Sequence, residues 1–201
     1  QKKEEDFKII LNWLEDGSKV LDLGCGEGDL ISHLTDKKNI SGYGIEKDII
    51  KINRSINKGI NVIHADFNEM LKEYFDDDFF DYAIMTQTLQ ENKNPDKLIS
   101  EMLRVAKYAI VTFPNMGHWQ NRLHLSFKGE MPISKVLPNN WYDTPNIHLC
   151  TFKDFENLCF KQNIKILEKK VLNRFYRTGI LSKVSPNFFG EIALYKFTKK
   201  F

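Results

Sequence analysis

The chain has 201 residues, of which 42% are hydrophobic and 28% are charged, an ordinary composition for a water-soluble globular protein. This length suits one domain with a sizeable core, residues 1–201, and excludes two domains of comfortable size. The formal net charge is only +2 and the basic residues are spread along the chain, so the composition indicates neither nucleic-acid nor membrane binding.

The first third of the chain predicts helices and strands in alternation. Residues 5–15 carry apolar side chains at helical spacing, and Asp16-Gly17-Ser18 ends that helix. A strand over 19–23 follows, then a glycine-rich turn. The remaining elements of this part are a helix carrying Leu30, Ile31 and Leu34, a strand over 39–46, a helix after Asp48 with Ile49, Ile52 and Ile56 on its apolar face, and a strand over 61–65.

The alternation continues to residue 113. The acidic run Asp76-Asp77-Asp78 is typical of a turn, and a strand over 80–85 follows it. Pro95 opens a helix whose core face is Leu98, Met102, Leu103 and Val105, and the next strand covers 108–113. Strands that alternate with helices predict a Rossmann-like, doubly wound α/β fold with a mostly parallel sheet.

The pattern breaks over residues 114–150, which hold four of the six prolines and two of the three tryptophans. We interpret this segment as an insertion, the cap, rather than as a separate domain. A helix over 153–162 and strands near 164–171 and 191–198 then predict an antiparallel hairpin that ends the sheet.

The most informative stretch is Asp22-Leu23-Gly24-Cys25-Gly26-Glu27-Gly28, which lies between a strand and a helix. Glycines in such a turn let the backbone approach a nucleotide-like ligand closely, since a Cβ would block it. The amides at the start of the following helix then face the polar groups of the ligand. Cys25 is expected to be a small filler in this turn rather than a nucleophile.

Two further acids follow the next two predicted strands. Glu46 lies 18 positions after Gly28, close to the spacing at which an acid meets ribose hydroxyls in nucleotide-binding βαβ units. Asp66 ends the third strand, where a carboxylate could accept from the amino group of an adenine. Together with Asp22 these acids predict a polar rim around a nucleoside.

The spacing of the turn favours a nucleoside with an amino-acid tail over a dinucleotide. Nicotinamide enzymes show G-x-G-x-x-G, whereas Asp29 stands here at the position of the third glycine. A carboxylate would repel a pyrophosphate and attract an ammonium group. The pattern resembles motifs of the S-adenosylmethionine-dependent methyltransferase superfamily.

Further segments, some in the cap and some upstream of it, make the resemblance more specific. They are Thr86-Gln87-Thr88-Leu89-Gln90, Glu101-Met102-Leu103-Arg104-Val105, the run 113–119, Gly129-Glu130-Met131-Pro132, and the run 141–150. Together they resemble the methionine biosynthesis protein MetW family from about residue 19 to 168. That resemblance implies a class I methyltransferase fold and a role beside a MetX-type homoserine O-acyltransferase, with S-adenosylmethionine or S-adenosylhomocysteine as the bound nucleoside.

The predicted cofactor-binding residues come from the glycine turn and the following strand ends. They are Asp22, Gly24, Cys25, Gly26, Gly28, Glu46, Lys47, Asp66, Phe67 and Gln87. No metal site is predicted, because Cys25, Cys150 and Cys159 are odd in number and lack metal-ligand spacing; reduced thiols and a cytoplasmic location are expected. No apolar run approaches the ~20 residues that cross a bilayer.

Two classes of function stay open at this point. The favoured one is an accessory or regulatory partner of the acyltransferase, and the alternative is an active small-molecule methyltransferase. Residues 86–90 contain no base at neutral pH, so no catalytic residue is assigned. Among His118, His124 and His148, the first and last are expected to hold the cap to the sheet, and Trp119, Arg122, Trp141 and Tyr142 to form part of a protein interface.

Overall fold

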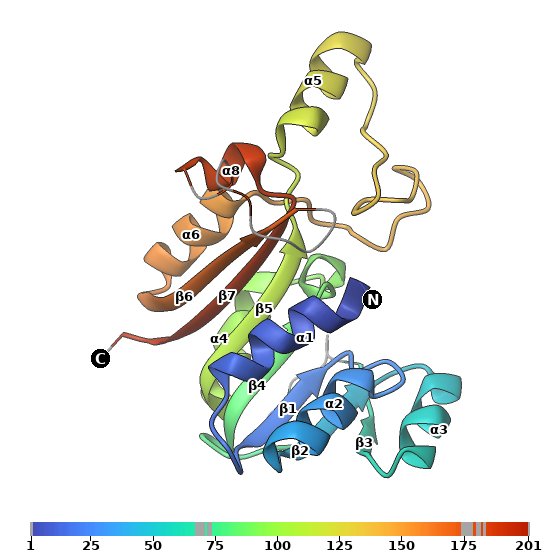
Figure 1. The fold of residues 1–201 in the computed structure, drawn as a ribbon, viewed down its shortest axis with the longest axis vertical. Coiled ribbons are helices and arrows are strands. Elements are labelled where there is room, and N and C mark those ends of the chain that lie inside the picture. The colour runs from blue at the N-terminus through green and yellow to red at the C-terminus, as the bar shows by residue number, and fades with distance from the viewer. Residues whose placement is uncertain are drawn as a thin grey trace.

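A seven-stranded sheet forms the middle of the molecule in the computed structural model, which describes residues 2–66, 71, 74–173, 179, 182 and 184–200 (Figure 1). Its order is β3-β2-β1-β4-β5-β7-β6. The strands are β1 (Lys19–Leu23), β2 (Ser41–Glu46), β3 (Asn61–His64), β4 (Phe80–Thr86), β5 (Ala106–Pro114), β6 (Ile164–Leu172) and β7 (Ile192–Lys199).

The helices precede, separate or follow these strands. They are α1 (Lys2–Trp13), α2 (Asp29–Lys38), α3 (Ile49–Asn57), α4 (Pro95–Val105), α5 (Trp119–Lys128), α6 (Phe152–Lys161) and α8 (Pro186–Phe189), with a short 3-10 helix η2 (Leu89–Glu91). In the described part of the chain, none of them has the length and apolarity that crossing a bilayer requires.

The strand pairing confirms the predicted fold class. Strands β1 to β5 pair in parallel, with β1 between β2 and β4. Strand β7 runs antiparallel between β5 and β6. This mixed sheet with an antiparallel β7 is the class I methyltransferase fold, and the parallel strands bring their carboxyl ends to one edge.

Alternating side chains along the strands build a core on each face of the sheet. One face buries Leu21, Ala83 and Met85 against α4 and α6. The other face buries Val20 and Ile84 against α1 and α2. This layering fixes α1 across the sheet, beside the strands whose ends carry the predicted site (Figure 1).

The predicted apolar face of α3 is wrong in part. Ile52 is buried, but Ile49 and Ile56 are exposed. The buried partner of Ile52 on this helix is Ser55, whose hydroxyl donates a hydrogen bond of 2.9 Å to the carbonyl of Gly26. Helix α3 therefore turns a polar side chain toward the glycine loop and leaves two isoleucines in solvent.

The cap, residues 114–150, contains one regular element, α5, which stands away from the sheet (Figure 1). Asn115 anchors its base, because the Asn115 amide group donates to the carbonyl of Gly190 at 2.7 Å and its backbone N–H donates to the carbonyl of Glu191 at 2.8 Å. Asn121 is the buried residue of α5. The cap is thus fixed at its base while most of α5 faces solvent.

Candidate functional site

The loop between β1 and α2 is built on three glycines with left-handed backbones. The φ angles are 77° at Gly24, 58° at Gly26 and 75° at Gly28, a conformation that side chains disfavour. Backbone amides of Gly24 and Cys25 both donate to the carbonyl of Ile45, at 2.9 and 3.1 Å. These bonds hold the loop against the end of β2.

The glycines of this loop have different roles. A Cβ added to Gly26 would meet no heavy atom within 4 Å, so the backbone there is open to an approaching molecule. A Cβ on Gly28 would lie 2.4 Å from the Cδ1 atom of Ile60, so Gly28 makes room for packing. Of these two glycines, Gly26 therefore leaves open space beside the loop, and Gly28 does not.

Cys25 fills space, as predicted. Its side chain is buried, and a Cβ on Gly44 of β2 would lie 2.4 Å from its sulfur. Burial, with Asp22 and Glu46 nearby, raises the pKa of the Cys25 thiol to about 12. A thiol with this pKa is protonated at neutral pH, and the protonated form is a poor nucleophile.

The Glu46 carboxylate organises the centre of the site. It is buried at the end of β2 and accepts hydrogen bonds from the backbone amides of Gly26, Lys47 and Asp48, at 2.9, 2.9 and 3.0 Å. A carboxylate has about four acceptor positions, so one stays available for a hydroxyl group. Glu46 thus ties the glycine loop to the start of α3 and still offers an acceptor.

The other predicted rim residues lie at the same edge of the sheet. Asp22 is buried within β1, and Asp66 is half-buried directly after β3. Because the strand order places β3, β2 and β1 side by side, Asp66, Glu46 and Asp22 follow one another across the edge. Phe67 lies outside the described residues.

Electrostatics link Lys47 to a residue that the sequence analysis missed, Glu91 of η2. Burial is the main cause that raises the pKa of Glu91. The positive charges of Lys47 and Lys51 oppose that shift, and the negative charge of Glu46 adds to it. Glu91 interacts electrostatically with both Glu46 and Lys47, so it lies close to the polar rim at the carboxyl ends of the strands.

Gln87, at the end of β4, adopts an unusual backbone conformation. Its φ of 59° is left-handed, although it is not a glycine. The backbone N–H of Gln87 donates to both the carbonyl (2.9 Å) and the hydroxyl (3.0 Å) of Thr112 in β5. The next residue, Thr88, donates to the carbonyl of Leu23 at 3.4 Å, which brings this corner to the start of the glycine loop.

Asp6 of α1 reaches the same corner and was missed from the sequence. Its side chain is only 4% exposed and is hydrogen-bonded to the Gln87 side chain. Its Oδ1 atom is fully buried without a hydrogen-bond partner among the described residues. Burial is the main cause that raises the pKa of Asp6 to about 7, and the neighbouring Glu5 adds to the shift.

A weak signal for Asp6 exists in the sequence. Ile10 and Leu14 are buried residues of the N-terminal segment, and Asp6 lies one helical turn before Ile10 on the same face. The adjacent Glu4 and Glu5 suggest that all three acids are exposed to solvent, so the position of Asp6 on the buried face of the helix is easily overlooked. Only the packing of α1 on the sheet distinguishes the buried acid.

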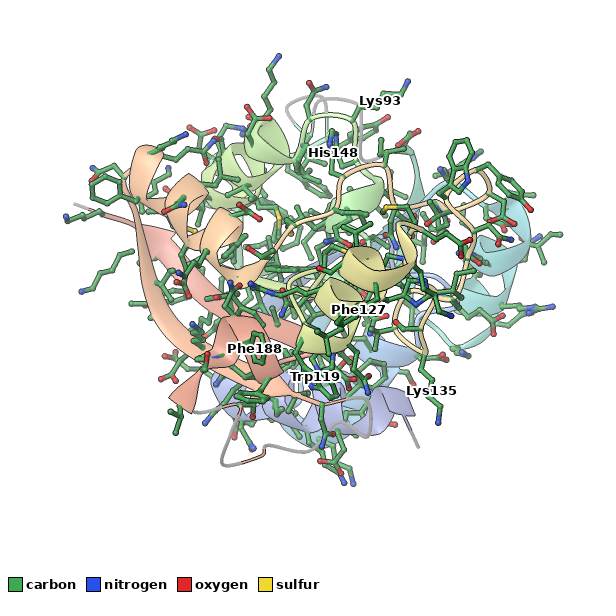
Figure 2. The ribbon with its side chains drawn as sticks, turned by 90° about the horizontal axis from the view of Figure 1, so that it is seen from above. Lys93, Trp119, Phe127, Lys135, His148 and Phe188 are labelled. Atoms are coloured by element: carbon green, nitrogen blue, oxygen red, sulfur yellow. The ribbon has the colours of Figure 1, made fainter. Side chains whose placement is uncertain are left out.

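The cap histidines contact backbone and charged groups at its base. The Nε2 atom of the His148 ring is 3.2 Å from the carbonyl oxygen of Lys93 (Figure 2). His118 is buried, with Nε2 3.8 Å from a carboxylate oxygen of Glu191. His148 thus contacts the loop before α4, and His118 lies near the residue that precedes β7; that the two residues hold the cap to the sheet stays a prediction.

The outer surface of the cap is apolar and exposed. Phe127 at the end of α5 is 83% exposed, and Trp141 is 75% exposed beside Tyr142, with the two rings edge to face at 5.7 Å. Figure 2 looks down on α5 with Phe127 near the viewer. A cavity of about 550 Å³ lies between residues 129–133 and 137–149.

The four residues predicted to form an interface differ in their surroundings. Trp119 is half-buried, with its ring 5.9 Å from that of His118. The Arg122 guanidinium donates to the carbonyl of Gly117 at 2.5 Å and lies over the ring of Phe188. Trp119 and Arg122 thus contact the base of the cap, whereas Trp141 and Tyr142 are free to meet another molecule.

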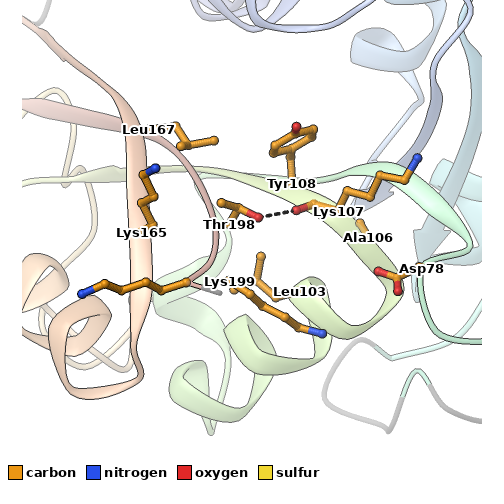
Figure 3. A pocket seen from close by; sticks show the side chains of 10 residues that line it. Asp78, Leu103, Ala106, Lys107, Tyr108, Lys165, Leu167, Thr198 and Lys199 are labelled. Carbon is orange, nitrogen blue, oxygen red and sulfur yellow. Dashed lines mark hydrogen bonds between the residues drawn. The ribbon is translucent and has the colours of Figure 1, made fainter.

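A larger cavity, of about 720 Å³, lies at the end of the sheet where β5 begins, opposite to the carboxyl ends of the parallel strands (Figure 3). Lys107 and Tyr108 line it from the start of β5, and Thr198 lines it from the end of β7, with the Thr198 hydroxyl donating to the carbonyl of Lys107 at 2.8 Å. Because Gly26 and Glu46 lie at the other edge, this cavity is separate from the predicted nucleoside site.

The acidic turn after residue 75 has a structural partner. Arg104 donates to the Asp77 carboxylate at 2.6 Å, and the backbone N–H of Asp78 donates to the carbonyl of Arg104 at 2.8 Å. In the described part of the chain, no group of three or more His, Cys, Asp or Glu side chains could hold a metal ion.

Comparison with known proteins places the chain among methionine biosynthesis proteins. The family "Methionine biosynthesis protein MetW" matches residues 4–197. The "Bifunctional methionine biosynthesis protein MetXA/MetW" of Rhodopirellula baltica is 35% identical over 173 residues, which cover 82% of this chain and 28% of that protein. The chain thus spans little more than a quarter of the length of this relative.

Solved structures share the fold at low sequence identity. An S-adenosylmethionine-dependent methyltransferase from Mesorhizobium loti has a TM-score of 0.70 at 14% identity, covering 96% of this chain and 97% of that one. One from Archaeoglobus fulgidus has a TM-score of 0.69 at 15% identity, covering 98% and 93%. The [4+2]-cyclase SpnF has a TM-score of 0.67 at 18% identity, covering 99% and 81%, so this fold does not by itself imply methyl transfer.

Proposed function

The chain belongs to the MetW family of methionine biosynthesis proteins, and from this premise we propose that it is an accessory or regulatory partner of a MetX-type homoserine O-acyltransferase. In this proposal the chain binds S-adenosylmethionine or S-adenosylhomocysteine at the carboxyl edge of its sheet. It meets the acyltransferase through the cap.

The observation that carries the partner role is the exposed apolar surface of the cap. Phe127, Trp141 and Tyr142 face solvent on a segment that is anchored at its base through Asn115. Exposed aromatic groups on a fixed scaffold are typical of protein interfaces, where they supply much of the binding energy. The name of the R. baltica relative supports the same pairing, because it joins MetXA and MetW in one bifunctional protein.

Two features at the carboxyl ends of the parallel strands support the proposed ligand. Gly26 leaves open space beside the loop, and Glu46 keeps an acceptor position next to it. A nucleoside diol can donate to such a carboxylate. Adenosylmethionine is chemically derived from methionine, so its binding here would let the acyltransferase respond to the end of its own biosynthetic route.

The experiment combines association with activity. The purified chain and the homoserine O-acyltransferase of the same organism are mixed, complex formation is measured by size-exclusion chromatography, and acyl transfer is measured with and without adenosylmethionine. A stable complex with altered acyl-transfer activity supports the proposal. Absence of any complex, together with unchanged acyl transfer, contradicts it.

The alternative function is methyl transfer to a small molecule, and Asp6 is the observation that favours it. This carboxyl group of α1 contacts Gln87 at the end of β4. Its pKa is about 7, so it could accept a proton near neutral pH. Transfer of a labelled methyl group from adenosylmethionine to an acceptor, without the acyltransferase, would favour this alternative over the accessory role.

A further inference from the structure

We propose that Asp6, together with Gln87, holds the α-ammonium group of the ligand's amino-acid tail and so makes the site selective for nucleosides that carry one. This inference rests on the proposed nucleoside site. It adds a residue from α1 that lies outside the glycine loop and the strand ends.

The strand order gives the direction of the ligand. Asp66 follows β3, Glu46 ends β2, and the glycine loop follows β1. An adenine at Asp66 and a ribose at Glu46 therefore point the 5′ substituent across β1 toward β4, the next strand in the sheet. The tail would then reach the end of β4, where Gln87 lies.

The Gln87 corner is tied to that path by direct contacts. Thr88 donates to the carbonyl of Leu23, directly before Gly24, at 3.4 Å. Two hydrogen bonds from the Gln87 backbone to Thr112 hold the left-handed turn in place. Asp6 contacts the Gln87 side chain, so its carboxyl group lies beside the end of the path.

The chemistry of Asp6 calls for a cation. Asp6 is only 4% exposed, and its Oδ1 atom has no hydrogen-bond partner among the described residues. A buried acceptor without a partner is costly and rare unless it has a function. An ammonium group would donate to it and stabilise its ionised form, because an opposite charge within about 4–6 Å favours the carboxylate.

The test compares two ligands and three proteins by isothermal titration calorimetry. The ligands are S-adenosylhomocysteine and its deaminated analogue, in which hydrogen replaces the α-amino group. The proteins are the full chain, Asp6→Asn, and Glu5→Gln as a matched control. Glu5 lies next to Asp6 on α1, is 46% exposed and pairs with Lys8, so its substitution removes a charge from the same helix without touching Gln87.

We expect Asp6→Asn to weaken binding of S-adenosylhomocysteine by about tenfold or more while binding of the deaminated analogue stays unchanged, as loss of a charge-assisted hydrogen bond predicts. Glu5→Gln should change neither affinity by more than about twofold. Asn is close to Asp in shape and removes a buried charge, so the variant is expected to fold.

Two outcomes would overturn the inference while leaving the proposed function intact. These are equal binding of both ligands to the unmodified chain, and an Asp6→Asn variant that binds S-adenosylhomocysteine as tightly as the unmodified chain does. Loss of methyl transfer in Asp6→Asn at unchanged ligand affinity would instead assign Asp6 as a base. If neither ligand binds the unmodified chain, the nucleoside site itself is wrong, and this inference fails with it.

Discussion

The carboxylate of Glu46 accepts a hydrogen bond from the backbone amide of Gly26 at 2.9 Å, which joins the end of β2 to the glycine loop that follows β1. The loop is therefore preorganised by the same side chain that is expected to bind the ribose. A substitution at Glu46 acts on loop and ligand together.

Replacing Glu46 by alanine should lower the stability of the ligand-free chain and weaken nucleoside binding. Three backbone amides lose their acceptor, and bonds to a charged group are each worth about 1.5–3 kcal/mol. Because water partly replaces the lost acceptor, we expect a net loss of about 2–4 kcal/mol, measured by urea denaturation. An unchanged unfolding midpoint would show that these bonds do not hold the loop.

Gly26→Ala should abolish nucleoside binding at a small cost in stability. The new Cβ meets no protein atom, so the cost is the left-handed backbone strain of about 1–2 kcal/mol, and the methyl group occupies the open space. Gly59→Ala is the matched control, because Gly59 also has a positive φ, 77°, and nothing within 4 Å of its Cβ. Calorimetry should separate the two variants; equal nucleoside affinity in both would remove Gly26 from the site.

Phe127→Ala should weaken the complex with the acyltransferase by about 2 kcal/mol or more, roughly thirtyfold in Kd, if Phe127 is a central interface residue. Phe160→Ala is the matched control, since Phe160 on α6 is 86% exposed and lies outside the cap. Nucleoside binding should persist in both variants. Identical losses of partner affinity, or none in either, would place the interface elsewhere.

Asp6→Asn should make folding stability less dependent on pH. The Asp6 pKa is about 7 in the folded chain and close to 3.8 when unfolded, so the unfolded state loses its proton first as pH rises. The folded chain thus becomes less stable between about pH 4 and 7, and the full cost persists above pH 7.

Asparagine lacks that cost, so the variant should match the unmodified chain below pH 4 and exceed its stability by a few kcal/mol at pH 8. Glu5 beside Asp6 and His33 near Phe7 are present in both proteins, so their contributions cancel in the difference. Parallel stability curves from pH 4 to 8 would contradict the assignment of a buried, protonated Asp6.

Local sequence patterns predicted the sheet well because each strand and turn is encoded by neighbouring residues. Strand β1 covers Lys19–Leu23, as the apolar run and the glycines after it predicted. Pro95 opens α4, also as predicted. The exposed Ile49 and Ile56 could not be predicted, because their burial depends on which neighbour α3 packs against. The ligand-binding roles of the loop residues stay predictions.

The proximity of the candidate site residues was predictable within one βαβ unit and unpredictable between segments that lie far apart in the sequence. Gly26 and Glu46 are 20 positions apart in one βαβ unit, and their spacing carries the signal. Asp6 and Gln87 are separated by 81 positions, and only the packing of α1 across the sheet brings them together. The role of Gly28 in packing against Ile60 likewise depends on tertiary contacts.

The position of β7 between β5 and β6 has a consequence for synthesis on the ribosome. Strand β7 is translated last of the seven, yet it supplies the hydrogen-bonding partner of both neighbours. Until residues 192–199 emerge, the edge of β5 is unpaired and β6 has no place in the sheet. The nascent chain therefore passes through a stage with an open, apolar strand edge, the kind of surface that chaperones protect and that aggregates when they do not.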